Sequence, residues 1–400
     1  MAKAPTTTYG NDSISMLKGA ERVRKRPSVI FGSDGLEGCE HAVFEILSNA
    51  IDEAREGFGN IITVTRYEDK SIEVEDFGRG CPVDWNEKEQ RYNWELIFCE
   101  MYAGGKYKNN EGENYEYSLG LNGLGACATQ YASEYMDVTI WRDGKKYTLH
   151  FRHGEVVGGL ESAPADRKKT GTTIRFWPDV KAEDDPNGIF ETGDFQYDVL
   201  KTRFREMAFL NRGIRIVFRD ERPEEPKENV FHYEGGISEF VKFINKNKEV
   251  LFAEPIYISG LVGTTSVEVA MQYNDTYSEN IFAFVNNIHT PDGGTHLAGF
   301  NMALTRVIND YGRKHNILKA NDTNLSGEDT REGLAAIVSV KLEDPQFESQ
   351  TKSKLGNSEV RTIVNSLVGK QLADYLEENP QVAKLILDRC LAASRAREAA

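Results

Sequence analysis

The architecture of this 400-residue chain is best inferred from the segment Glu40-His-Ala-Val-Phe-Glu-Ile-Leu-Ser-Asn-Ala-Ile-Asp-Glu-Ala54. Apolar side chains recur there about every 3.6 residues, which predicts an amphipathic helix. Glu45, Asn49 and Asp52 lie within about 60° of one another on the opposite face of that helix. Such a face is ordinarily exposed to solvent. A carboxylate and an amide one turn apart also suit a site that activates water beside Mg²⁺, which prefers oxygen ligands.

A second polar segment follows the strand predicted for residues 72–75 and reads Asp76-Phe-Gly-Arg-Gly80. Its two glycines let the backbone approach a flat ligand, while the aspartate can accept a hydrogen bond from an exocyclic amine. Taken alone, this pattern more often marks an ordinary turn. The order of the motifs along the chain is therefore more informative than any one of them.

Two glycine-rich loops come next, Ala103-Gly-Gly-Lys106 and Gly120-Leu-Asn-Gly-Leu-Gly125. The second leads into a predicted helix near Ala126, and backbone N–H groups at a helix start form an anion site that suits a triphosphate. The dinucleotide-fold and P-loop signatures do not match. Thr170-Gly-Thr172 precedes a strand and Gln350-Thr-Lys352 lies in a polar loop, and each is unremarkable alone.

The alternation of apolar residues predicts a largely antiparallel sheet in the first half of the chain. A hairpin is expected from strands 61–67 and 71–75, and a second from strands 136–141 and 147–151 around a turn that contains Gly144. Strands are also expected at 172–177 and 214–219. One long helix with several hairpins indicates an α+β fold rather than a doubly wound parallel sheet.

The second half begins after the charged segment 220–229, which contains two prolines and places the domain join near Tyr233. We therefore divide the chain into a basic N-terminal arm at 1–34, a first domain at 35–233 and a second domain at 234–400. The elements expected in the second domain are helix 237–245, strands 266–273 and 281–286, helix 296–315, strand 335–341 and one long helix from Ser358.

Bulk properties narrow the class of protein. The net charge of −15 argues against a surface coated for nucleic acid, although it is compatible with a local basic wall. The five cysteines show no C-x-x-C spacing, so reduced thiols in a cytoplasm are expected. No apolar run approaches the ~20 residues that a membrane helix needs. We expect a cytoplasmic protein with no membrane partner.

The order of these motifs resembles the ATP-binding fold shared by gyrase, Hsp90, histidine kinases and MutL, the GHKL or Bergerat fold. Within that superfamily the sequence is similar to the gyrase B family of type IIA topoisomerases over about residues 9–400. The segments that carry this resemblance are Asn49-Ala-Ile-Asp-Glu53, Ala103-Gly-Gly-Lys106, Phe176-Trp-Pro178, Tyr233-Glu-Gly-Gly236, Gly293-Gly-Thr-His296 and Asp344-Pro-Gln-Phe-Glu-Ser-Gln-Thr-Lys-Ser-Lys-Leu355.

The resemblance implies an α/β sandwich that binds ATP, followed by a transducer domain similar to the ribosomal S5 fold. It implies that Glu45 is the general base, that Asn49 is the Mg²⁺ ligand and that Asp76 accepts from the adenine amino group. Gln350 and Lys352 are expected to reach the γ-phosphate from the second domain. The other nucleotide contacts that it implies are Tyr9, Asp52, Glu53, Arg79, Gly80, Lys106, Tyr115, Gly120, Leu121, Asn122, Gly123, Leu124, Gly125 and Thr172.

The resemblance also implies partners. Tyr9 and Ile14 would belong to the arm that reaches into a second copy, so ATP should favour a homodimer that clamps double-stranded DNA. A gyrase A subunit in an A2B2 complex and aminocoumarin-type inhibitors are the other expected partners. Three positions depart from the common family pattern, namely Ile30, Asn122 and Asn301. A topoisomerase IV B subunit, a divergent paralogue, a clamp without turnover and a phosphotransfer kinase stay open as alternatives.

Overall fold

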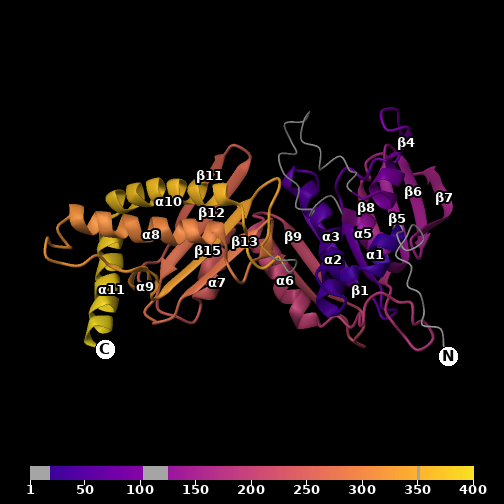
Figure 1. The fold of residues 1–400 in the computed structure, drawn as a ribbon. Coiled ribbons are helices and arrows are strands. Elements are labelled where there is room, and N and C mark those ends of the chain that lie inside the picture. The colour runs from indigo at the N-terminus through magenta and orange to yellow at the C-terminus, as the bar shows by residue number, and fades with distance from the viewer. Residues whose placement is uncertain (1–18, 102–124, 349–351) are drawn as a thin grey trace, which may run out of the picture.

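The computed structural model describes residues 19–101, 125–348 and 352–400. Two lobes follow each other along the chain (Figure 1): the first half, drawn from indigo to magenta, forms one lobe, and the second half, drawn from orange to yellow, forms the other. Each lobe is built on one sheet with helices packed against it. Within the described ranges, no helix combines the length and apolar character needed to cross a membrane.

The first lobe contains an eight-stranded sheet in the order β10-β9-β1-β2-β8-β5-β6-β7. Its neighbouring strands are antiparallel except for β1 and β9, which are parallel. Both hairpins predicted from the sequence are confirmed. The strands are β1 (Ile61–Arg66), β2 (Ile72–Asp76), β5 (Ser133–Arg142), β6 (Lys145–Arg152), β7 (Glu155–Pro164), β8 (Gly171–Pro178), β9 (Arg215–Asp220) and β10 (Lys227–His232).

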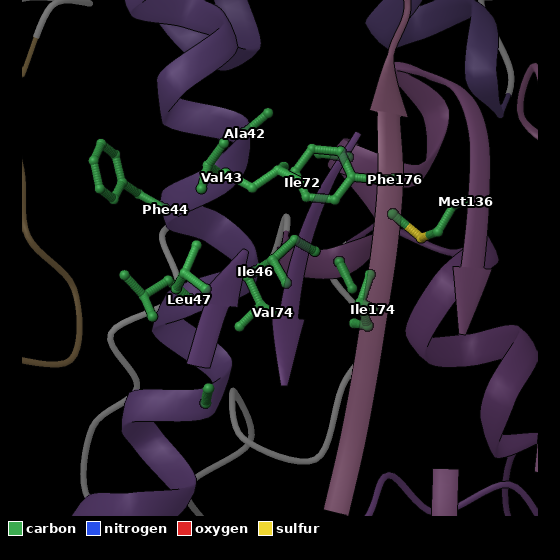
Figure 2. Packing of buried hydrophobic residues seen from close by; sticks show 14 of the residues in the cluster. Ala42, Val43, Phe44, Ile46, Leu47, Ile72, Val74, Met136, Ile174 and Phe176 are labelled. Atoms are coloured by element: carbon green, nitrogen blue, oxygen red, sulfur yellow. The ribbon is translucent and has the colours of Figure 1, made fainter. Parts of the chain in front are cut away.

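Helix α3 (Leu36–Arg55) lies against the sheet. Its apolar side chains, among them Val43 and Ile46, point toward Ile72 and Val74 of β2 (Figure 2). The opposite face of this helix is not simply a solvent-exposed face, because the side chains of Glu45 and Asp52 are also buried.

The remaining elements of this lobe are short, apart from α6. They are α1 (Ala20–Lys25), α2 (Pro27–Phe31), the hairpin β3 (Trp85–Asn86) and β4 (Arg91–Tyr92), α4 (Asn93–Cys99), α5 (Gly125–Tyr131) and α6 (Tyr197–Leu210). Val23 of α1 and Phe31 of α2 are buried in the core of the lobe. This corrects the expectation for residues 20–31, which pack as part of the lobe and not as an arm. Residues 1–18 lie outside the described residues, so an arm there stays a prediction.

The second lobe contains a five-stranded sheet in the order β11-β12-β15-β13-β14. All eight residues of β15 are buried, because helices cover both faces of this strand. Helices α8 and α10 run alongside each other over one face, and α7 lies on the other (Figure 1). The elements are α7 (Ile237–Ile244), β11 (Ile256–Val262), β12 (Thr265–Tyr273), β13 (Asn280–Val285), β14 (Ile288–His289), α8 (Thr295–Lys314), α9 (Gly327–Arg331), β15 (Leu334–Lys341), α10 (Ser358–Glu378) and α11 (Pro380–Ala399).

The single long C-terminal helix predicted from Ser358 is wrong. The structure has two helices, which meet at Asn379. Pro380 is the first residue of α11, and a proline has no N–H to continue the preceding helix, so the chain bends there.

An aromatic cluster joins the lobes. Phe209 at the end of α6 stacks on Tyr233, with ring centroids 3.7 Å apart, and on Phe240 of α7, with centroids 4.7 Å apart. Nearby, the Lys341 Nζ donates to the Leu210 carbonyl at 3.3 Å. The last turn of α6 is therefore fixed to the second lobe by both apolar and polar contacts.

Candidate functional site

Glu45 lies near the middle of α3, and its side chain is only 3% exposed. One carboxylate oxygen, Oε1, lies 3.0 Å from the Nε2 of His41, one helical turn earlier. The other oxygen, Oε2, is buried and has no hydrogen-bond partner among the described residues. A buried carboxylate oxygen without a partner is unfavourable for folding. Such an atom is therefore more easily explained by chemistry than by stability.

Lys352 brings a second charge of this kind from the other lobe. Its Nζ is also buried, and no group in the described ranges accepts a hydrogen bond from it. Burial lowers the pKa of the Lys352 ammonium, and the Glu45 carboxylate acts in the opposite direction. Two residues that are 307 positions apart in the sequence thus lie within electrostatic reach of each other.

Asp76 ends β2 and organises a different part of the site. Its Oδ1 accepts from the Gly78 N–H at 2.9 Å and from the Thr172 N–H at 3.2 Å. The Thr172 hydroxyl in turn accepts from the Cys81 N–H at 3.1 Å. Gly171, the first residue of β8, has φ +142°, and a Cβ there would come within 2.2 Å of the Asp76 carbonyl oxygen. Only glycine lets β8 approach β2 so closely.

Glu53 and Arg79 form an ion pair at the entrance to this region. The Arg79 Nη2 lies 2.7 Å from Glu53 Oε1, and its Nε lies 3.2 Å from Glu53 Oε2. The hydrogen bonds to Glu53 raise the pKa of Arg79. The guanidinium also lies 4.3 Å from the centre of the Phe58 ring. These contacts fix the Arg79 side chain even though about a third of it is exposed.

A groove of about 580 Å³ opens beside this ion pair. Its lining includes three arginines, Arg79, Arg142 and Arg167. Arg142 donates to the Gly80 carbonyl at 2.9 Å, which holds it against the segment that follows β2. Asp143 also lines the groove, so its lining carries more positive than negative charge in a chain of net charge −15, and it would attract an anionic or polar ligand.

The structure brings most of the described candidate residues together. Glu45, Asn49, Asp52 and Glu53 share α3, and Asp76, Arg79 and Gly80 follow β2 next to Thr172. Gly125 is the first residue of α5. Asp52 also bears on the joint between the lobes, because burial lowers the pKa of Lys341 on β15 and the Asp52 carboxylate acts in the opposite direction. Seven candidate positions and one range lie outside the described residues: Tyr9, Lys106, Tyr115, Gly120, Leu121, Asn122, Gln350 and 123–124.

Sequence reasoning missed two contributors. His41 could have been found, because it precedes Glu45 by four residues and therefore lies on the same helix face. Gly171 could have been suspected from its place between two threonines before a strand, but only the structure shows what its missing side chain would meet.

In comparison with known proteins, each lobe matches a family model. Residues 36–182 match the model of the histidine kinase-, DNA gyrase B- and HSP90-like ATPase family, and residues 236–400 match the DNA gyrase B family model. The 43K ATPase domain of Thermus thermophilus gyrase B, solved in complex with an aminocoumarin, is 38% identical with a TM-score of 0.78, and the alignment covers 96% of each chain. The chain belongs to the DNA gyrase B family.

Other members of the gyrase B family are closer in sequence. The DNA gyrase B protein of Clostridium acetobutylicum is 50% identical over 98% of this chain, and that of Streptococcus pneumoniae is 48% identical over the same share. The chain spans about 60% of the length of these two relatives. The topoisomerase IV ATP-binding domain of Francisella tularensis, solved with a small-molecule inhibitor, is 28% identical with a TM-score of 0.74 and covers 96% of this chain and 98% of that one.

Within the gyrase B family the present chain therefore corresponds to the ATPase region, with an α+β ATPase lobe followed by a transducer lobe. The two buried charged atoms that have no partner among the described residues, Glu45 Oε2 and Lys352 Nζ, come one from each lobe.

Proposed function

We propose that this chain is the ATP-hydrolysing module of a type IIA topoisomerase, in which ATP binding closes a dimeric clamp on double-stranded DNA and hydrolysis is coupled to strand passage and supercoiling. The observation that carries this proposal is the pair of buried charges without partners in the described residues, Glu45 Oε2 and Lys352 Nζ. A general base and a cation supplied by two separate lobes are what hydrolysis of a phosphoanhydride and its coupling to motion require.

In this proposal Glu45 accepts a proton from the attacking water, and His41 holds the other carboxylate oxygen so that Oε2 is aimed at that water. Lys352 stabilises the negative charge that develops on the γ-phosphate. Both groups act in a site with little solvent, where charge interactions are stronger than in water. Asp76 accepts from the adenine amino group, and Thr172 supports it from β8.

The donor set fits Mg²⁺ that is held largely by the nucleotide. Residues 19–101, 125–348 and 352–400 contain no group of three or more His, Cys, Asp or Glu side chains that could hold a metal ion. Mg²⁺ usually takes one or two protein ligands and completes its shell with waters and phosphate oxygens. Asn49, one helical turn after Glu45, would supply an amide oxygen, and the metal would neutralise phosphate charge.

In this proposal ATP contacts both lobes, and this contact is the basis for the proposed protein partners. A ligand shifts a conformational equilibrium only through contacts that differ between the states, and Lys352 would contact ATP only when the second lobe is in place. We propose that the resulting closed form is a homodimer joined through the N-terminal arm with Tyr9. A gyrase A subunit would complete an A2B2 complex. Lys106, Tyr115, residues 120–124 and Gln350 complete the nucleotide site in this proposal.

The groove lined by Arg79, Arg142 and Arg167 is the proposed site for aminocoumarin-type inhibitors. The Thermus thermophilus ATPase domain was solved with such a compound, and its fold covers nearly all of this chain. The sequence identities favour a gyrase over a topoisomerase IV, because gyrase B proteins of several bacteria are 47–50% identical over nearly the whole chain.

The deciding experiment compares ATP hydrolysis by the wild type and by Glu45→Gln over a range of protein concentrations. Dimerisation is followed in parallel with a non-hydrolysable analogue. Glu40→Gln is the matched control, since Glu40 is a buried carboxylate on the same helix but lies about 140° around it from Glu45. We expect a more than linear rise of turnover with wild-type concentration, a loss of hydrolysis but not of dimerisation in Glu45→Gln, and turnover near wild type in the control.

Other outcomes would select a different function. Equal hydrolysis by Glu45→Gln and the wild type would show that Glu45 is not the base. Dimerisation without turnover in every variant, the wild type included, would indicate a nucleotide-dependent clamp. A stably phosphorylated side chain after incubation with ATP would indicate a phosphotransfer enzyme.

A further inference from the structure

We propose that Gly294 is a positioning residue for hydrolysis: the turn Gly293–His296 forms a backbone seat that places Lys352, and only glycine fits at position 294. This inference rests on the role proposed above for Lys352. It concerns how the second lobe positions the Lys352 Nζ, for which the described residues contain no hydrogen-bond acceptor.

The seat contacts the segment around Lys352 through the main chain. The Asp292 N–H donates to the Ser353 carbonyl at 2.9 Å. Leu355 then makes two bonds, with its N–H donating to the Gly293 carbonyl and its carbonyl accepting from the Thr295 N–H, each at 3.1 Å. Three backbone hydrogen bonds therefore hold Ser353 and Leu355, the first and third residues after Lys352.

Gly294 lies at the centre of this contact. It has φ +130°, a conformation that residues with a side chain rarely adopt. A Cβ at this position would lie 2.4 Å from both the backbone N and the carbonyl O of Leu355. The obstacle is backbone rather than the end of a flexible side chain, so the segment after Lys352 would have to move away. A methyl group at Gly294 therefore acts as a wedge against the Lys352 segment.

The seat itself is firmly attached to the lobe. His296 is fully buried at the start of α8, and its Nε2 lies 3.1 Å from the Thr290 hydroxyl. That hydroxyl donates to the Ala283 carbonyl on β13 at 3.0 Å. A wedge at position 294 would consequently displace the Lys352 segment rather than the seat.

The side chain of Asn357 also joins the two ends of the segment that contains Lys352. The Asn357 Oδ1 accepts from the Gln346 N–H at 2.6 Å, and its Nδ2 donates to the Asp344 carbonyl at 3.0 Å. Leu355 is fully buried in the core of the lobe. The chain on both sides of Lys352 is therefore held in place, by the bonds of Asn357 to Asp344 and Gln346 and by the buried Leu355.

The test is Gly294→Ala, assayed for kcat, for KM and for binding of a non-hydrolysable ATP analogue in the full chain. A displacement of about 1 Å at a reacting group can cost about 100-fold in rate. We expect kcat to fall roughly 10- to 100-fold, while KM and analogue binding change less than about threefold, because the adenine side of the site belongs to the other lobe.

Gly263→Ala is the matched control. Gly263 lies in the same lobe with φ +62°, and no described atom lies within 4 Å of its added Cβ. It carries a positive φ, with milder backbone strain than at Gly294, and no wedge, so kcat should stay near that of the wild type. A fall in kcat equal to that of Gly294→Ala would overturn the proposal, because strain alone would then explain the loss.

Lys352→Ala separates this inference from the proposed function. If Lys352→Ala hydrolyses ATP normally, the assigned role of Lys352 is wrong. If Lys352→Ala is inactive and Gly294→Ala is normal, only the seat is wrong. In the double variant we expect no loss beyond that of Lys352→Ala, since residues that act as one unit are not additive. A further multiplicative loss would show that Gly294 acts through another group.

Should Gly294→Ala fail to fold, Gly293→Ala loosens the same seat more gently. Gly293 has φ +72°, its Cβ would lie 2.9 Å from the Leu297 side chain, and its carbonyl accepts from the Leu355 N–H, so strain at this residue acts on a bond that holds the Lys352 segment. A several-fold fall in kcat at unchanged KM would support the seat, and an unchanged kcat would overturn it.

Discussion

In the first lobe, Asp76 accepts two backbone N–H groups from β8 and from its own turn, so a charged side chain is fixed by the sheet around it. In the second lobe, the Lys352 Nζ is buried and no described group accepts a hydrogen bond from it, while backbone hydrogen bonds hold Ser353 and Leu355, which follow it. The first arrangement is preformed and stabilises the fold. The second leaves a charge whose partner must come from elsewhere.

This difference assigns the two stages of the proposed reaction to different lobes, with nucleotide binding depending on the first lobe and hydrolysis on the second. Changes near Asp76 should weaken nucleotide binding, because that side chain is already in place before ATP arrives. Changes around Lys352 should slow turnover and leave affinity nearly intact. The predictions below test whether the two lobes can be separated in this way.

The largest effect that we expect is a loss of stability of the second lobe at acid pH. Burial lowers the pKa of His296 from 6.5 to about 3 in the folded chain. Below pH 6.5 the unfolded chain takes up a proton that the folded chain does not, so this contribution to stability is lost as the pH falls from 6.5 toward 3. Between pH 6.5 and 4 the loss amounts to about 3 kcal/mol. His296→Gln should abolish this component of the loss.

The measurement is urea unfolding at pH 7 and pH 4, with two signals. All four tryptophans, Trp85, Trp94, Trp141 and Trp177, lie in the first lobe, so their fluorescence reports on that lobe, whereas circular dichroism reports on both. We expect circular dichroism to show acid destabilisation that His296→Gln reduces, with a smaller change in fluorescence. An equal acid loss in His296→Gln and the wild type would contradict the prediction.

Asp76→Ala should give the next largest effect. It removes the acceptor of two N–H groups, and a hydrogen bond to a charged group contributes about 1.5–3 kcal/mol. We expect analogue affinity to fall about 100-fold, which is about 2.8 kcal/mol. Asp137→Ala is the control, because Asp137 lies on the same sheet but pairs with the exposed His150. A loss of kcat without loss of affinity in Asp76→Ala would contradict the comparison.

The sequence was sufficient for much of the first lobe, and the reason is local. The period of 3.6 over 40–54 predicted α3, and the alternation after it predicted the β1–β2 hairpin. The burial of Glu45 was not predictable in this way, since amphipathicity describes one face of a helix and cannot tell whether another element covers the opposite face. The proximity of Glu45 and Lys352 depends on the packing of two lobes, which no local pattern records.

The second lobe shows a different failure. Apolar periodicity continued through Asn379-Pro380, so one helix was predicted where two exist. The proline was a readable stop signal that periodicity concealed. In the sequence, Gly294 stood out only as part of a family motif. A glycine is needed there because the backbone of Leu355, 61 residues later in the chain, leaves no room for a Cβ.

A substitution of Lys341 tests the contact between the two lobes, with a smaller expected effect on stability. Burial lowers its pKa from 10.5 to about 8, so at pH 7 the folded chain carries an unfavourable charge. The unfolded chain binds more protons between pH 8 and 10.5, and stability should therefore rise with pH in that window. Lys341→Met removes the charge but also the bond to Leu210. We expect a net gain of about 1–2 kcal/mol at pH 7.

Unfolding of Lys341→Met and the wild type from pH 7 to 10 measures this. The advantage of the variant should shrink as the pH passes 8. A variant that is less stable than the wild type at pH 7 would show that the contact with the Leu210 carbonyl outweighs the cost of burial.

Arg79→Ala should give the smallest effect, because its ion pair with Glu53 lies at the entrance and is about a third exposed. Such pairs contribute roughly 0.2–1 kcal/mol and are screened by salt. We expect analogue affinity to fall less than about fivefold, with a smaller difference in 0.5 M salt than in 0.05 M, roughly as the screening length shortens. Isothermal titration calorimetry at both salt concentrations measures it. A loss as large as that of Asp76→Ala, and independent of salt, would mean that Arg79 contacts the nucleotide directly, and the preformed part of the first lobe would then extend from Asp76 to the entrance of the groove.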